Sequence, residues 1–303
     1  MKKAIKADLL LFLVTLFWGA GFPITKFALA TITPFYHIGF RFFIASILLS
    51  IIFHRKLKGL KKDIMMPSFI LSVFLFACYA LQTIGLQYTT ASKSGFFSGL
   101  SVLFVPVISI FYLKARLKKN TLIGILMATL GLLLLSYSGD MFSFNIGDFI
   151  TIISTICYAW QLLFTGNFVK KHDATLLAIV QLFFVSVYGF IGAFIFEPIP
   201  SQISILSFNS LLFSAVLCTA FAFWVQTTIQ QYTSASHIAL VITMEPVFGA
   251  LTSYLFLGEI LGFKGIMGGI CIVGAMIVTE IQLPDSLSNM FRIGSKQKRN
   301  LSS

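Results

Sequence analysis

The chain has 303 residues, of which 57% are hydrophobic and only 11% are charged, and its formal net charge is +12. A soluble domain of this size could not keep so much apolar surface from water, so the composition indicates a protein of the lipid bilayer. The positive charge does not indicate a nucleic-acid-binding protein. Such a protein clusters basic residues on a folded, water-exposed face, and the polar segments here are too short to form one.

Ten hydrophobic stretches are long enough to be membrane-spanning helices, because about 20 apolar residues cross about 30 Å of hydrocarbon. We therefore predict an all-α integral membrane protein with ten transmembrane helices. The tail at 283–303 is polar and basic, and we expect it to be disordered. The predicted spans are residues 8–30, 33–53, 64–87, 93–113, 120–137, 147–168, 175–196, 209–230, 235–257 and 263–282.

Lysine and arginine gather in alternate joints between these spans. If the N-terminus is cytoplasmic, the joints on that side hold nearly all the basic residues, and only Lys93 and Lys264 fall in joints on the opposite side. This is the bias that orients membrane proteins, with basic loops in the cytoplasm. We expect a multi-pass protein of the inner membrane with both termini in the cytoplasm.

The chain contains an internal repeat. Residues 82–92 read QTIGLQYTTAS and residues 226–236 read QTTIQQYTSAS, in the same register of two hydrophobic stretches. Ten spans give five to each half, 8–137 and 147–282, and an odd number requires the second half to enter the membrane in the opposite sense. Inverted repeats place the same segment at both mouths of one central path, which is how they produce alternating access.

Charged residues inside predicted spans are candidate functional groups, since they cost about 2.5–3.5 kcal/mol at the bilayer centre on insertion scales. Glu245 lies deepest, and the following Pro246 is expected to bend the helix. Glu245 could serve transport, or it could be a structural residue, protonated or hydrogen-bonded between helices. Arg41 could pair with Glu245, bind an anionic group of a solute, or hold its helix against a neighbouring carbonyl. Lys26 lies near the outer end of its span, where its stem could also reach the interface.

Aromatic and amide side chains in the spans are either packing material or the lining of a cavity. An amide in lipid is unfavourable unless it is satisfied, so the glutamines are expected to face inward, where pairing with one another is the alternative. The four cysteines lack metal-ligand spacing, and no metal or cofactor is expected. Further candidates for the cavity wall are Trp18, Tyr79, Gln82, Tyr158, Trp160 and Gln226.

Several of these segments carry a resemblance. They resemble the ten-helix group of the drug/metabolite transporter superfamily, which is built from two EamA domains. The matching motifs are PheTrpGlyAlaGlyPhe at 17–22, Phe40-Arg41-Phe42, and MetGluProValPheGlyAla at 244–250 followed by LeuGlyGlu at 257–259. The resemblance covers about 8–282. It implies helices 1–4 and 6–9 around a central cavity, and helices 5 and 10 outside, in contact within a monomer or across a homodimer. Ser101-Val102 stands where the second half has Glu245-Pro246, so Glu245 would act without a symmetric partner.

The resemblance implies a carrier, often an exporter, for amino acids or related solutes. We expect a secondary transporter that works by alternating access, with aromatic walls, glutamine hydrogen bonds and the charges of Arg41 and Glu245. Proton coupling through Glu245 is one option, and a facilitator or exchanger needs no such group. The alternatives are a lipid-head-group flippase or a nucleotide-sugar carrier. More remote is an integral-membrane enzyme, because the histidines are scattered without a catalytic spacing.

Overall fold

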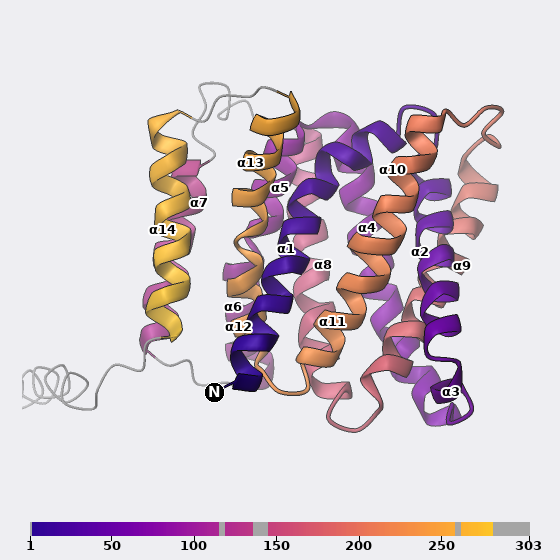
Figure 1. The fold of residues 1–303 in the computed structure, drawn as a ribbon, viewed down its shortest axis with the longest axis horizontal. Helices are drawn as coiled ribbons and strands as arrows, with labels where there is room; N and C mark the ends of the chain where they lie inside the picture. The colour runs from indigo at the N-terminus through magenta and orange to yellow at the C-terminus, as the bar shows by residue number, and fades with distance from the viewer. Residues whose placement is uncertain (1, 115–118, 136–144, 258–261, 281–303) are drawn as a thin grey trace, which may run out of the picture.

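A computed structural model describes residues 2–114, 119–135, 145–257 and 262–280, which form helices joined by short turns (Figure 1). The tail at 283–303 lies outside the described residues. One helix is interrupted by a π-helical turn, Val216–Phe221. The elements in chain order are α1 (Lys2–Ala28), α2 (Pro34–Ile52), α3 (His54–Leu57), a 3₁₀ turn (Lys62–Ile64), α4 (Met65–Tyr88), α5 (Ala91–Gly99), α6 (Ser101–Leu113), α7 (Lys119–Leu135), α8 (Ile146–Phe168), α9 (Ala174–Phe196), α10 (Ile205–Ala215), the π-helical turn, α11 (Ala222–Ile229), α12 (Ala235–Ile242), α13 (Glu245–Leu257) and α14 (Phe263–Glu280).

The all-α membrane fold expected from hydrophobicity is confirmed. Eight segments of the described chain are long and apolar enough to cross a membrane, and they coincide with predicted spans one to four and six to nine. Two shorter apolar helices, Lys119–Leu134 and Phe263–Ala275, coincide with the fifth and tenth. The structure is consistent with ten spans.

The fourth and ninth predicted spans are each interrupted, and the interruption falls at the same place in both halves. α5 and α6 begin at Ala91 and Ser101, and α12 and α13 begin 144 residues later, at Ala235 and Glu245. In the second half Pro246 lies in the first turn of a new helix, where its missing N–H is tolerated. The bend expected at this proline is therefore a complete break in the helix.

The fifth helix of each half lies outside the main bundle. α7 and α14 stand side by side at the left of Figure 1, at the edge of the bundle. A Cβ on Gly131 would lie 2.7 Å from the carbonyl oxygen of Gly268, so the two backbones touch. The small residues of these helices therefore make their close contact within one monomer.

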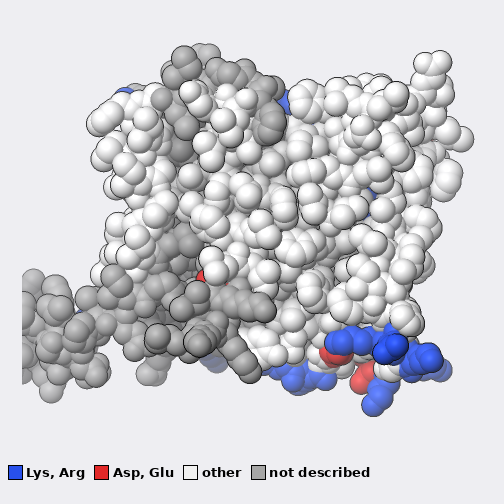
Figure 2. Space-filling model, in the orientation of Figure 1, with Lys and Arg blue, Asp and Glu red and all other residues white. Residues whose placement is uncertain are grey.

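Most of the charged side chains on the face drawn in Figure 2 lie at one end of the bundle. Figure 2 shows Lys and Arg along the lower edge and a broad uncharged band above it. This end includes α3 and the turn before α9, where Lys56 Nζ lies 2.8 Å from Asp173 Oδ2. The band is the face expected of a protein whose helices are surrounded by lipid.

Candidate functional site

A cavity lies between helices of both halves. The space among the lining residues, with its open mouth included, is about 700 Å³. The lining comes from α1, α2, α4, α5, α8, the π-helical turn and the α12–α13 break. The lining residues are Trp18, Gly21, Phe22, Thr25, Arg41, Cys78, Tyr79, Gln82, Thr83, Leu86, Ser98, Ser154, Thr155, Tyr158, Cys218, Ile242 and Glu245.

Arg41 is buried in the cavity wall with 6% of its surface exposed. Its Nε donates to Thr219 Oγ1 at 2.6 Å, and its Nη2 donates to the carbonyl oxygen of Cys218 at 3.4 Å. The guanidinium carbon lies 4.8 Å from the ring centroid of Tyr79, a cation–π distance. These contacts fix the side chain but supply no negative charge, so the guanidinium keeps its charge for another partner.

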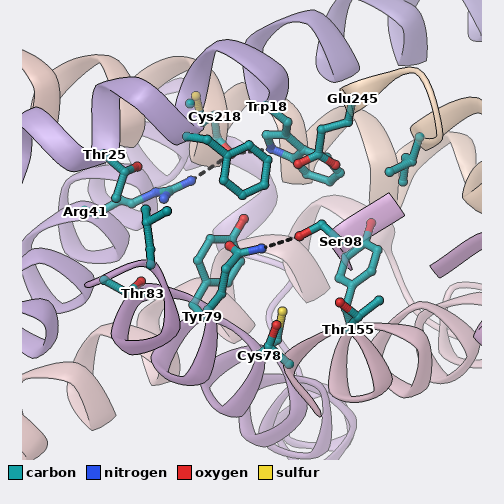
Figure 3. Close-up of a pocket in the computed structure, with 17 residues that line it drawn as sticks. Trp18, Thr25, Arg41, Cys78, Tyr79, Thr83, Ser98, Thr155, Cys218 and Glu245 are labelled. Atoms are coloured by element: carbon teal, nitrogen blue, oxygen red, sulfur yellow. Dashed lines mark hydrogen bonds between the residues drawn. The ribbon is translucent and has the colours of Figure 1, made fainter. Parts of the chain in front are cut away.

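The π-helical turn Val216–Phe221 supplies both hydrogen-bond acceptors for Arg41. Thr219 Oγ1 donates to the carbonyl oxygen of Ser214, five residues earlier, and the carbonyl oxygen of Cys218 also accepts from Trp18 Nε1 at 2.7 Å. Single π-helical turns inside α-helices are frequent at functional sites. This turn holds together α1, α2 and the α10–α11 helix at the cavity (Figure 3).

Glu245 opens α13 at the helix break and is 7% exposed. Within the described part of the chain, its carboxylate has no hydrogen bond and no ion pair. It does not pair with Arg41, and the two side chains lie toward opposite sides of the cavity in Figure 3. The cavity therefore holds a buried guanidinium group and a buried carboxyl group that do not pair with each other directly.

The two glutamines of the sequence repeat occupy different positions. Gln82 lines the cavity, and its Nε2 donates to Ser98 Oγ at 2.8 Å. Gln226 is fully buried outside the lining, where its Oε1 accepts from Tyr158 Oη at 3.2 Å. Pairing of amides does occur elsewhere, between Gln161 Nε2 and Gln181 Oε1 at 3.2 Å.

Six of the nine candidate residues line the cavity, and three do not. Trp160 instead packs in an aromatic cluster with Phe74, Phe164 and Tyr112, the last at 5.0 Å between ring centroids. Lys26 Nζ donates to the carbonyl oxygen of Thr89 at 3.0 Å, at the end of α4. The third is Gln226. The six that line the cavity are Trp18, Arg41, Tyr79, Gln82, Tyr158 and Glu245.

Small hydroxyl residues contribute to the lining, and sequence reasoning did not select them. They include Thr25, Ser98, Ser154 and Thr155. A Ser or Thr on an apolar helix gives a weak signal, because its hydroxyl can satisfy itself on the preceding backbone turn. Thr155 Oγ1 does so, and it also donates to the carbonyl oxygen of Phe97 at 3.0 Å, close to the α5–α6 break.

Gly19 allows α1 to approach Glu245 closely. A Cβ at this position would lie 2.6 Å from the carbonyl oxygen of Glu245 and 2.7 Å from the backbone nitrogen of Gly249. We expect Gly19→Ala to push α13 away and to destabilise the protein by about 1–3 kcal/mol, the usual cost of overpacking. Thermal unfolding in detergent measures this. Gly269→Ala is the matched control, since its Cβ would meet its nearest neighbour at 3.8 Å. Equal melting temperatures of the two variants would contradict the expectation.

Both halves of the chain match one known protein family. The model of the EamA-like transporter family matches residues 5–137 and 145–280. The chain belongs to the EamA-like transporter family. The resemblance found in the sequence motifs is therefore confirmed, and the protein is a multi-pass membrane protein of a transporter family.

Relatives and solved structures agree with this assignment. An uncharacterized transporter of Archaeoglobus fulgidus is 33% identical over 283 residues, 93% of this chain and 88% of the relative. The uncharacterized transporter YetK of Bacillus subtilis is 28% identical over 282 residues, 87% of this chain and 83% of the relative. A protein with a solved crystal structure superposes with a TM-score of 0.76 at 15% identity, covering 91% of this chain and 96% of the other. The last similarity concerns the fold alone.

Proposed function

We propose that this protein is a secondary transporter of the inner membrane that moves a small solute through the cavity by alternating access. The observation that carries the proposal is the pair of buried ionisable groups, Arg41 and Glu245, which do not pair with each other in a cavity lined by both halves. Ionisable groups inside membrane proteins mark solute and ion paths, because isolated charges there are costly. The family and the names of its relatives point to transport rather than to an enzyme.

The two charges favour a solute that carries both signs, such as an amino acid or a related compound. Arg41 would bind a carboxylate, because a guanidinium presents several donors to such a group. Glu245 would bind an ammonium group on the other side. The aromatic faces of Trp18, Tyr79 and Tyr158 would enclose the apolar part of the solute.

The direction of the repeat supports alternating access. The start of α8 lies beside the ends of α1 and α4, because Thr89 contacts both Lys26 and Asp148. The first helices of the two halves therefore run in opposite directions. With the basic end in the cytoplasm, Thr25 and Leu86 of the cavity lining lie near the outer ends of their helices.

Coupling to protons would use the carboxyl group of Glu245. This group has no partner that holds it within the described chain, so it is available to exchange a proton when the cavity fills with water. A solute gradient alone would suffice for a facilitator or exchanger. In either case we propose export as the physiological direction, in keeping with the family resemblance.

A screen of metabolites for thermal stabilisation of the detergent-purified protein, followed by flux of each hit into proteoliposomes, tests this function. We expect amino acids or compounds carrying both charges to raise the melting temperature and to move across the membrane. Stabilisation by nucleotide sugars or lipid head groups instead would assign the solute to those classes. Stabilisation without any flux would contradict transport.

A further inference from the structure

Two carboxylates at the starts of the first helices of the halves contact basic side chains. Asp148, in the first turn of α8, lies with Oδ2 3.5 Å from Lys93 Nζ at the start of α5. Asp8, near the start of α1, lies with Oδ1 3.0 Å from His237 Nε2 at the start of α12. Each contact joins one half of the chain to the other.

The internal repeat relates these two contacts to each other. Asp148 follows Asp8 by 140 residues, the offset at which Tyr158 follows Trp18 in the same pair of helices. His237 follows Lys93 by 144 residues, the offset at which α12 and α13 follow α5 and α6. The Lys93–Asp148 pair and the Asp8–His237 pair are therefore the same contact with the roles of the halves exchanged.

The two pairs lie at opposite ends of the helix bundle. Asp148 Oδ1 accepts from Thr89 Oγ1 at 2.5 Å, and the carbonyl of Thr89 accepts from Lys26, so the Lys93–Asp148 pair lies where α1 and α4 end. The Asp8–His237 pair lies where α1 begins, at the lower edge of Figure 1. With the basic end in the cytoplasm, the first pair is at the outer mouth and the second is at the inner mouth.

We propose that the Lys93–Asp148 pair and the Asp8–His237 pair are the latches of the two gates, and that each transport cycle breaks first one and then the other, so that one is always closed. This inference rests on the proposed function. The pairs span the two halves at the ends of the path, so a rocking motion of one half against the other must separate one of them. Motion in the opposite sense separates the other.

The two latches differ in strength. In the Lys93–Asp148 pair the side chains are 13% and 1% exposed, and Asp148 also accepts from Thr89 and from the backbone N–H of Asn145. In the Asp8–His237 pair they are 38% and 21% exposed. A buried charge pair costs more to break than a partly exposed one. The outer latch is therefore the more strongly closed of the two.

Accessibility of one cavity residue from each side of the membrane tests the proposal. Ser98→Cys is placed in a chain whose four native cysteines are replaced by alanine, because Ser98 lines the cavity. Vesicles of both orientations are treated with a membrane-impermeant thiol reagent. Lys93→Gln should raise labelling from outside about tenfold or more, and Asp8→Asn should raise labelling from inside about threefold, in line with the difference in burial.

Asp173→Asn is the matched control. The Lys56–Asp173 pair also joins the halves, but it lies on the α2–α9 seam, where a Cβ on Gly189 would lie 2.6 Å from the backbone nitrogen of Gly39. Because this backbone contact holds α2 and α9 together independently of the Lys56–Asp173 pair, the variant should label as the parent does from both sides. The exchange of charges in Lys93→Asp with Asp148→Lys should return outside labelling toward the parent rate, which shows that the effect is not one of misfolding.

Labelling that rises on the same side for both variants, or on neither side, would overturn the latch assignment. Solute flux in the parent protein is measured separately. Flux with unchanged labelling in both variants refutes the latches and leaves the transporter intact. Side-specific labelling without flux of any solute supports the latches and refutes the transport function.

Discussion

Glu245→Gln is expected to lower solute flux by about 10- to 100-fold, the effect of losing a charged hydrogen bond of about 1.5–3 kcal/mol. The carboxylate is buried at the break between α12 and α13 and has no ion-pair partner in the described chain. In the proposed function, a solute ammonium group is its partner in transport. Glutamine has nearly the same shape but carries no charge, so the change removes the charge without opening a cavity.

The same variant separates proton coupling from charge recognition. Glutamine can neither release nor take up a proton, so flux through Glu245→Gln should no longer respond to an imposed pH gradient. Proteoliposomes with and without such a gradient measure this. Glu197→Gln is the control, because Glu197 accepts hydrogen bonds from Thr33 and Phe35 at the end of α9, away from the cavity lining. Flux and pH response equal to the parent in Glu245→Gln would remove Glu245 from the mechanism.

Arg41→Lys is expected to weaken solute binding about 10-fold, and Arg41→Gln about 100-fold. Lysine keeps the charge, but its single ammonium group cannot reproduce the planar contacts of the guanidinium with Thr219, the carbonyl of Cys218 and the ring of Tyr79. Glutamine loses the charge as well. The graded loss follows if the guanidinium binds an anionic group of the solute.

Titration of thermal stabilisation with a solute from the screen measures these affinities. The melting temperature without solute reports the structural part of the effect, since Arg41 also holds α2 to the π-helical turn. Arg55→Gln is the control, because Arg55 is exposed in α3 at the basic end of the bundle. If both Arg41 variants lose thermal stability without losing affinity for the solute, Arg41 has a purely structural role.

Hydrophobic length and the repeat were sufficient to predict the architecture. Each predicted span corresponds to an apolar segment of the structure, because backbone groups in lipid must be satisfied within helices. The break at Pro246 had a local cause that the sequence reveals. The break after α5 has no proline at the equivalent place, and only the repeat itself relates the two.

The cavity was less predictable, since the rotation of each helix decides which side chains face it. Trp160 and Tyr158 are separated by two positions on α8, and only Tyr158 faces the lining. The π-helical turn was also missed, because nothing in ValLeuCysThrAlaPhe distinguishes it from an ordinary apolar helix. Its hydrogen bonds to Arg41 and Trp18 depend on helices far away in the chain.

The symmetry between the halves fails at the groups that carry charge. Position 41 is arginine, but its counterpart 140 residues later is Gln181. Glu245 corresponds to Ser101, and the regular helix α4 corresponds to a helix with a π-helical turn. A cavity with perfect two-fold symmetry would bind a solute in two equivalent orientations, related by reversal of its ends. Under the proposed function, the unequal halves would distinguish the two ends of the solute, so the same molecule should keep a single orientation throughout its passage.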